Sequence, residues 1–398
     1  MRTIGTVVRG VRAPIIREGD NIAEVAAASV MEAWKEAGIE PRDRDVVAVT
    51  ESVVARAQGN YATLDQIAKD VREKTGGGTV GVAFPILSRN RFSLLLRGIA
   101  SGVKKVVLML SYPSDEVGNH LVSMDQLDEA GIDPWHDVLS LQQFRDAFGE
   151  VIHPFTGVDY VTYYKSIIED AGAEAEIVFA NRVQAVLDYT DTVICCDIHT
   201  RKRSKRLLTA AGAKRVLGLD DLLTASVDGS GYNPQYGLLG SNKADEERVK
   251  LFPRDAMPVA EAVSRAMSEA TGKRIEAMVY GDGAFKDPVG KIWELADPVV
   301  APGYTGGLVG TPNELKLKYL ADKEFAGLSG QALQDAISQK IREKDAKVSL
   351  VGNMVSEGTT PRNITDLIGS LCDLTSGSGD KGTPIIYIQG YFDNYTNE

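Results

Sequence analysis

The sequence predicts a two-domain protein of mixed α/β and α+β class, with a core built from both chain ends and a parallel-sheet α/β domain inserted between them. The 398 residues exceed the length of one ordinary domain. Apolar residues make up 43% and charged residues 25%, a balance typical of a globular protein with a full core. Strand-like and helix-like segments alternate between residues 79 and 229, which indicates parallel β-α-β units. We therefore expect a core of 1–78 and 230–398 around an insert of 79–229.

The first 78 residues begin with a strand-like segment, Thr3–Arg9, and contain a second, buried strand at Val46–Thr50. Asn21 is a good helix N-cap residue. The helix that it begins has one apolar face, formed by Ile22, Val25, Ala26, Val30 and Trp34. A shorter helix is expected from Leu64 to Val71.

The middle of the chain carries the alternating pattern. Short apolar runs predict strands over 103–110, 175–179, 192–196 and 215–219, and amphipathic runs predict helices over 161–171 and 202–211. The segment from Tyr112 to Thr156 has clustered Pro, Gly, Asp and Asn residues, so we expect an irregular, lid-like excursion there.

The last part of the chain returns to a mixed pattern. Helices are expected over 259–271, 313–321, 330–345 and 365–374, and strands over 274–280 and 384–389. Gly272 follows the first of these helices at a C-cap position.

Composition excludes several classes of function. No window reaches the roughly 18 apolar residues that a membrane span needs, and the first residues read as a strand rather than a signal segment. The three cysteines, Cys195, Cys196 and Cys372, cannot form a disulfide framework, which favours a reducing compartment such as the cytoplasm. The net charge of −11 argues against nucleic acid as a partner. A phosphorylated ligand would need local basic groups, backbone amides or metal ions.

One glycine-rich motif, Gly377–Gly382, fits the pattern G-x-G-x-x-G. A dinucleotide-binding motif follows a strand and begins a helix, whereas this one follows a predicted helix and precedes a strand. We therefore reject nicotinamide or flavin binding on this motif. A phosphate-facing loop and a flexible connection both remain open.

A second glycine-flanked segment, Gly281–Asp287, follows a predicted strand and places Asp282 between two glycines. A carboxylate at a strand end can hold Mg²⁺ together with substrate phosphates, and Lys286 lies close enough in sequence to share such a site. The alternative is an ordinary turn that uses the aspartate for its own hydrogen bonds.

Two further segments lie in the inserted region. Cys195–Arg201 contains Cys, Asp and His but no second ligand pair at zinc spacing, so both cysteines are expected in the strand core, with a Cys–His nucleophile left open. Arg201–Arg206 is the most basic run, and a solvated face is favoured over an anion site.

Five blocks in order resemble the coenzyme F-420 gamma-glutamyl ligases. They are Val8–Ile22, Asp45–Gly59, Gly237–Asn242, Val279–Gly283 and Gly382–Gly390. The resemblance covers roughly the first 75 and the last 170 residues and leaves the inserted domain outside.

This resemblance implies an amide ligase that uses GTP (or ATP) and Mg²⁺ or Mn²⁺. Members of the family join glutamate through its amino group to a carboxylate on a deazaflavin precursor, and they assemble as dimers. We accordingly expect a small carboxylate and an amino acid as substrates, an acyl-phosphate intermediate and a homodimer.

The resemblance also assigns roles to residues. It places metal ligands at Asp282 and Asp366 and catalytic cations at Arg56 and Lys286. It implies nucleotide contacts from Thr50, Glu51, Arg56, Ser241 and Asn242. As a separate hypothesis, we expect Gly379, Asp380 and Lys381 of the glycine-rich loop to bind the nucleotide through backbone amides. Leu239 stands where the family has a further metal-binding aspartate.

Two alternatives stay open. The core could bind nucleotide and metal without catalysis, and this alternative is supported by Leu239 in place of the family's metal-binding aspartate. An enzyme could instead have its site in the inserted domain, at the strand end Cys196–Thr200, because open sheets bind ligands at the carboxyl ends of their strands.

Overall fold

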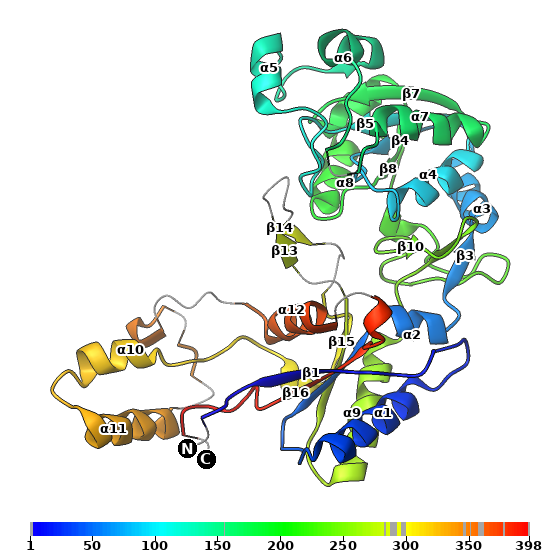
Figure 1. Cartoon of the computed structure of the whole chain (residues 1–398). Coiled ribbons are helices and arrows are strands. Elements are labelled where there is room, and N and C mark those ends of the chain that lie inside the picture. Colours follow the sequence, from blue (N-terminus) through cyan, green and yellow to red (C-terminus); the bar gives the residue numbers. More distant parts are fainter. Residues whose placement is uncertain are drawn as a thin grey trace.

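The computed structural model shows two lobes joined by short connections (Figure 1). We call them the core lobe, built on a five-stranded sheet, and the central lobe, built on a six-stranded sheet. The structure describes residues 3–154, 156–281, 284–286, 293–295, 300–344, 348–350, 352–356, 362–376 and 379–396, with only the backbone described at 284–286 and 293–295.

The core-lobe sheet combines strands from both ends of the chain. In spatial order the strands are β1 (Val7–Val11), β16 (Ile385–Gln389), β2 (Val46–Thr50), β12 (Glu276–Tyr280) and β15 (Gly303–Tyr304). β2 and β12 are parallel, and every other neighbouring pair is antiparallel. The first and last strands of the chain thus pair with each other, as the expected core built from both chain ends requires.

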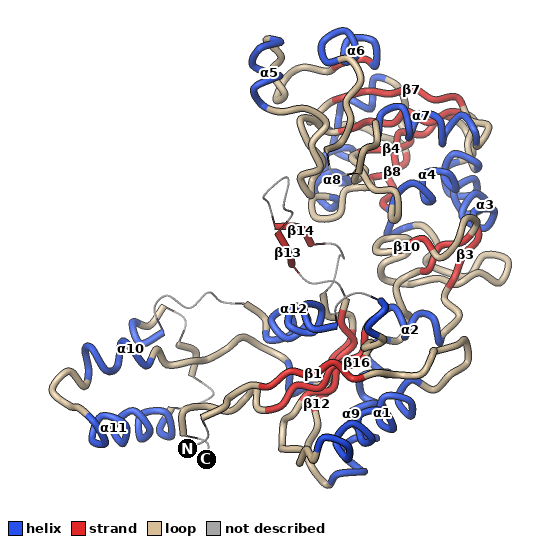
Figure 2. Tube along the Cα trace, viewed as in Figure 1, coloured by secondary structure: helices blue, strands red, loops and turns tan. Residues whose placement is uncertain are grey.

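Helices cover both faces of this sheet (Figure 2). The apolar faces of α1 (Ile22–Ala37) and α9 (Ala256–Thr271) form one apolar core with alternate strand residues, and α12 (Ile364–Ser376) forms the other core. Because both faces are buried, β2 is a continuous apolar run rather than an alternating one. The predicted caps are confirmed, since the Asn21 side chain accepts from two backbone amides of α1 and Gly272 ends α9 with φ of 65°.

Gly303 allows β15 to lie against the start of α9. A Cβ at this position would come within 2.2 Å of the Ala256 carbonyl oxygen, and neither backbone can yield easily. We expect Gly303→Ala to lower the free energy of unfolding by about 2 kcal/mol, because overpacking forces the backbone to shift. Urea denaturation measures this effect. Gly306→Ala is the matched control, since a Cβ there meets nothing within 4 Å, and an equal loss in both variants would contradict the prediction.

A small sheet lies between the lobes and links distant segments. It consists of β3 (Tyr61–Thr63), β11 (Arg248–Lys250) and β10 (Asn242–Lys243), all antiparallel. β3 follows α2 (Glu51–Ala57) and precedes α3 (Leu64–Thr75), which packs against the central lobe. Residues near 60 and near 250 are thereby held together next to the end of β2.

The central lobe is an open, mainly parallel sheet with helices on both faces. Its spatial order is β6 (Leu139–Ser140), β7 (Glu174–Phe179), β5 (Lys105–Leu110), β4 (Thr79–Ala83), β8 (Thr192–Cys195) and β9 (Arg215–Gly218). All are parallel except β6. One face packs on α4 (Phe92–Ser101) and α7 (Tyr160–Asp170), and the other on α8 (Arg201–Ala210) and the 3₁₀ helix η1 (Val183–Asp188).

The apolar core of this lobe extends beyond the expected insert. It includes Ala62, Leu64 and Ile67 on one side of the insert, and Val249 and Leu251 on the other. The boundaries at 78/79 and 229/230 therefore stay a prediction about sequence organisation, while the packing joins residues from about 62 to 251.

Two details of the predicted elements are wrong. The segment from Tyr112 to Thr156 is only partly irregular, because it contains α5 (Met124–Ala130) and α6 (Leu141–Phe148), each with a Ser-x-x-Gln capping box. The helix expected over 313–321 is confined to α10 (Leu317–Tyr319) and a π-helical turn at Leu320–Glu324. α11 (Gly330–Glu343) follows as predicted.

Short pieces complete the fold. The backbone of β13 (Ala284–Lys286) pairs antiparallel with β14 (Trp293–Leu295). Of the helices in the described ranges, none has the length and apolar character that crossing a membrane requires.

Candidate functional site

Three strand ends of the core lobe meet at one edge of the sheet, which we call the candidate edge and define by Thr50, Tyr280 and Pro384. Thr50 ends β2 and lies opposite Tyr280, the last residue of the parallel strand β12. The Thr50 amide donates to the Pro384 carbonyl at 3.0 Å, just before β16 begins. Gly281 continues from β12 and donates to the Val300 carbonyl at 2.8 Å. Carboxyl ends of parallel strands form a common site for ligands.

A lysine from the small sheet reaches the start of α2 at this edge. Lys250 Nζ lies 2.7 Å from Ser52 Oγ and 3.2 Å from Glu51 Oε1. Both ends of the ion pair are largely buried, with side-chain exposures of 12% for Lys250 and 7% for Glu51. Burial strengthens this interaction and fixes the position of the ammonium group.

Lys250 is the residue that sequence reasoning missed. It occupies a three-residue strand, and an isolated lysine in such a strand gives no local signal. The pairing of Asn242 with Lys250 in the β10–β11 ladder also brings the predicted Asn242 next to this group.

Arg56 adds a second cation on the same side of α2. It lies four residues after Ser52, the spacing that puts two side chains on one helix face, and both residues are exposed. Of the residues predicted for nucleotide binding, Glu51 pairs with Lys250 and Asn242 is its ladder partner, while Thr50 and Arg56 lie on the same strand–helix turn as Glu51.

The loop before β16 places its predicted residues in another environment. Gly379–Lys381 forms a 3₁₀ turn, and Asp380 and Lys381 are exposed. Lys381 lines an open groove together with residues of β1, α1 and the start of β16: Gly10, Val11, Arg12, Ser29, Glu32, Ala33, Glu36 and Thr383. Two cations, Arg12 and Lys381, thus face two glutamates there.

The Ser241 side chain has a different environment from those of Glu51 and Lys250. Its hydroxyl donates to the Leu238 carbonyl at 2.7 Å, and its side chain lines a pocket of the central lobe together with Leu239. Leu239 is 2% exposed, so apolar packing explains the residue type at the position where the family has an aspartate.

The proposed metal ligands are not assembled by described contacts. Asp366 lies in the first turn of α12, and Asn363 Nδ2 donates to its carboxylate at 3.0 Å. The α12 residue that lies against Val300, the partner of Gly281, is Gly369, one turn after Asp366. Asp282 is outside the described residues, and Lys286 is described only as backbone of β13. Among side chains in the described ranges, no three His, Cys, Asp or Glu residues come together as a metal group.

The cysteines of the central lobe fill the core, as expected. Cys195 and Cys196 are fully buried on opposite faces of the sheet. Burial raises the pKa of the Cys195 thiol to about 12 and that of Cys196 well above its ordinary value. A thiol in this state is a poor nucleophile, which disfavours the Cys–His alternative.

We expect neither Cys195 nor Cys196 to react with iodoacetamide at pH 8 in the native protein, because the thiolate is the reacting species. Mass spectrometry after a one-hour exposure measures the modification. The same protein in urea serves as the control and should be alkylated at both positions. Native alkylation of Cys196 at the rate of an unfolded thiol would restore the nucleophile interpretation.

The basic run of α8 is mostly a solvated face. Lys202, Arg203 and Arg206 are exposed, whereas Arg201 pairs with Asp220 at 2.9 Å and Lys205 with Asp221 at 2.5 Å. The interpretation favoured from sequence thus holds for the exposed cations.

Comparison with known proteins gives one match. The family model described as F420-0:Gamma-glutamyl ligase matches residues 10–390, nearly the whole chain. No curated protein matches the chain significantly. The family match spans both lobes, including the region that the sequence resemblance left outside.

Proposed function

We propose that this chain, which belongs to the F420-0:gamma-glutamyl ligase family, joins an amino acid to a small carboxylate substrate at the candidate edge, with a nucleoside triphosphate as the energy source. Family membership makes the protein a gamma-glutamyl ligase in general terms. The acyl-phosphate route, GTP or ATP as nucleotide, and Mg²⁺ or Mn²⁺ as metal are our proposals. So are a homodimeric state and action in the cytoplasm.

The chemistry needs an activated carboxylate. A carboxylate oxygen attacks the γ-phosphorus, the bond to the bridging oxygen breaks, and the nucleoside diphosphate leaves. The amino group of the second substrate then attacks the acyl carbon, inorganic phosphate leaves with the bonding electrons, and the amine loses a proton. The products are an amide, a nucleoside diphosphate, inorganic phosphate and a proton.

The observation that carries the proposal is the fixed ammonium group of Lys250 beside the ends of β2 and β12. Phosphoryl transfer asks a protein mainly for positioning and for positive charge near the moving oxygens. Lys250 and Arg56 supply two cations, and Asn242 adds an amide donor beside them. An acidic protein with a net charge of −11 needs such local cations to hold a triphosphate.

Asp282 and Asp366 are proposed to hold the divalent ion, with Lys286 as a further cation. The ion would supply positive charge to the phosphate oxygens when bound. Thr50, Glu51, Ser241, Gly379, Asp380 and Lys381 remain proposed nucleotide contacts. Of these, Ser241 lines the central-lobe pocket and Lys381 lines the groove beside β1 and α1.

The alternative of nucleotide binding without catalysis is favoured by one observation, the burial of Leu239 where the family has an aspartate. A turnover assay distinguishes a ligase from a protein that binds nucleotide without catalysis. The full chain is incubated with GTP or ATP, Mg²⁺ or Mn²⁺, glutamate and a panel of carboxylates that includes a deazaflavin precursor.

We expect diphosphate release that depends on the carboxylate, an amide product seen by mass spectrometry, and a hydroxamate when hydroxylamine replaces glutamate. Nucleotide binding without diphosphate release across the panel would favour the non-catalytic alternative. Absence of nucleotide binding in calorimetry would refute both.

A further inference from the structure

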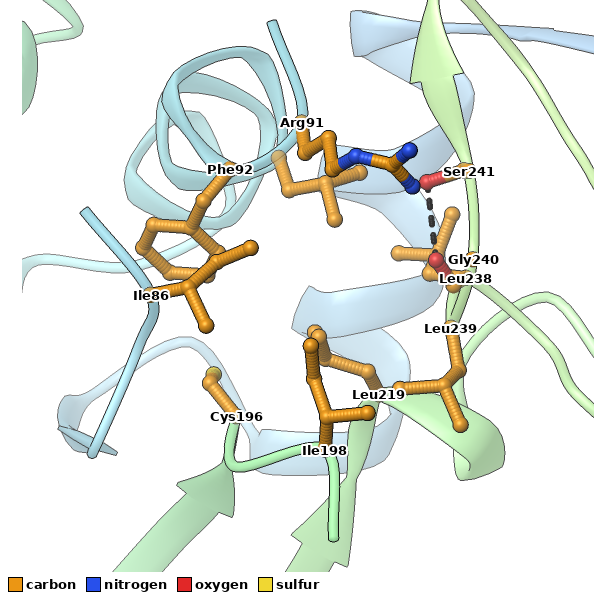
Figure 3. A pocket seen from close by; sticks show the side chains of 11 residues that line it. Ile86, Arg91, Phe92, Cys196, Ile198, Leu219, Leu238, Leu239, Gly240 and Ser241 are labelled. Carbon is orange, nitrogen blue, oxygen red and sulfur yellow. Dashed lines mark hydrogen bonds between the residues drawn. The ribbon is translucent and has the colours of Figure 1, made fainter. Parts of the chain in front are cut away.

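A pocket of the central lobe lies where open parallel sheets bind ligands. From β4 the chain continues to β5 and β7 on one side, and it later returns to place β8 and β9 on the other side. The strand order therefore reverses between β4 and β8, and the carboxyl ends of these two strands diverge into a crevice. Ile86 follows β4, Cys196 and Ile198 follow β8, and Leu219 follows β9. All four line the pocket (Figure 3).

The pocket is apolar with two polar side chains. Its cavity volume is about 30 Å³, and it opens to solvent at its mouth. Phe92 and Leu95 of α4 and the segment Leu238–Ser241 supply the remaining walls, and Arg91 and Ser241 are the polar residues. Such a lining accepts a small ring or a branched aliphatic group, and few polar groups then fix its orientation.

Next to this pocket, three consecutive backbone amides hold a carboxylate. Ile198, His199 and Thr200 precede α8, and their N–H groups donate to Glu116 at 2.6, 3.0 and 2.7 Å. Successive amides at a helix start form an anion-binding concavity. Ile198 joins the two features, because its side chain lines the pocket while its amide binds the carboxylate.

A buried carboxyl oxygen in the same loop lacks a donor. Asp197 lies between the pocket-lining residues Cys196 and Ile198 and is fully buried. Its Oδ2 accepts from Thr200 and Ser204 at 2.7 and 2.8 Å, but Oδ1 has no hydrogen-bond partner in the described part of the chain. A buried acceptor without a donor is costly and calls for a partner such as an ordered water.

The segment that carries Glu116 is anchored independently of it. Asp115 accepts from the Leu87 amide at 2.8 Å and from the amides of Val117 and Asn119 within its own loop. The loop therefore stays in place over the carboxyl ends of β4 and β8 even when the Glu116 side chain leaves the three amides.

We propose that the central lobe binds a small amphipathic anion at this switch point. The apolar part of the ligand fills the pocket, and its phosphate or carboxylate group takes the amides of residues 198–200 in place of Glu116. Glu116 thus acts as an internal competitor that keeps the site closed to weak ligands. This site is separate from the candidate edge, so its test does not depend on the ligase proposal.

Calorimetry on the full-length chain with phenyl phosphate and with benzoate tests the proposal. We expect Glu116→Ala to bind one of these probes about tenfold more tightly than the wild type, because the competing carboxylate is gone. The probe whose affinity increases more identifies the anion class as phosphate or carboxylate. Inorganic phosphate and benzyl alcohol should each gain less, since each fills only half of the site.

Three further variants make the test specific. Glu129→Ala, at an exposed position on α5, should leave binding unchanged. Leu239→Trp in the Glu116→Ala background should return binding to the wild-type level by filling the pocket. Glu116→Gln keeps a hydrogen-bond acceptor but loses the negative charge, so we expect about a threefold gain in affinity for the probe. This variant replaces Glu116→Ala in the test if Glu116→Ala does not fold. Folded Glu116 variants with wild-type affinity for both probes, or tight binding that survives Leu239→Trp, would overturn the proposal.

Discussion

Replacing Lys250 by alanine is expected to lower kcat/KM for amide formation by about 100-fold or more, since a preorganised charge at a transferring phosphoryl group commonly contributes that much. The loss should appear in kcat as well as in nucleotide affinity, because negative charge spreads over the phosphoryl oxygens in the transition state. Steady-state kinetics with the nucleotide varied measures both. Lys250→Arg retains the charge and should recover part of the activity.

Stability changes in the same variant and must be measured beside activity. Lys250→Ala removes one partner of the largely buried Glu51, and we expect a cost of about 3 kcal/mol in the free energy of unfolding. The matched control is Lys243→Ala on the neighbouring strand. Its partner Glu246 is 82% exposed, so that pair contributes at most about 1 kcal/mol. Folded Lys250→Ala with wild-type kinetics would remove this lysine from the proposed site.

The core-lobe strands were predictable because burial on both faces makes their signal local. Val46–Thr50 was expected with the boundaries that β2 has, since every residue of such a strand is selected to be apolar or β-branched. The caps at Asn21 and Gly272 were predictable for the same reason, because a cap acts within one helical turn.

Elements that depend on distant partners were missed. β3, β10 and β11 have two or three residues each and exist because Tyr61 pairs with Lys250 across the chain. α4 was missed as well, since most of its residues are buried and its sequence contains only one charged residue, Arg97.

The residues of the candidate site were likewise predictable where they come from one continuous segment, and less so where distant segments meet. Thr50, Glu51 and Arg56 were assigned from one continuous block, and the structure keeps them together because they lie on one strand–helix turn. Ser241 and Asn242 are adjacent in sequence, but the chain turns between them, so one faces the central-lobe pocket and the other pairs with Lys250. The pocket itself joins residues from five segments, and of these only the strand end that carries Cys196 and Ile198 was named from the sequence as a possible site of the inserted domain.

Asp282→Asn is expected to abolish metal-dependent nucleotide binding and to lower ligation by about 1,000-fold. The position follows Gly281, which the hydrogen bond to Val300 fixes at the end of β12. An amide in place of the carboxylate keeps the side-chain volume but removes the negative charge that a hard cation such as Mg²⁺ requires. Calorimetric titration with GTP or ATP, with and without Mg²⁺ or Mn²⁺, measures the effect.

Three controls separate a metal role from a structural one. Wild-type protein in EDTA should reproduce the binding loss of Asp282→Asn, whereas the variant itself should show little further response to EDTA. Asp366→Asn tests the second proposed ligand, and Asp245→Asn, at an exposed ion pair with Arg248, should leave binding intact. If Asp282→Asn binds nucleotide and responds to Mg²⁺ as the wild type does, the metal does not use this carboxylate. The ion would then be held by other groups, such as Asp366, and ligation by Asp282→Asn would still be lost in EDTA.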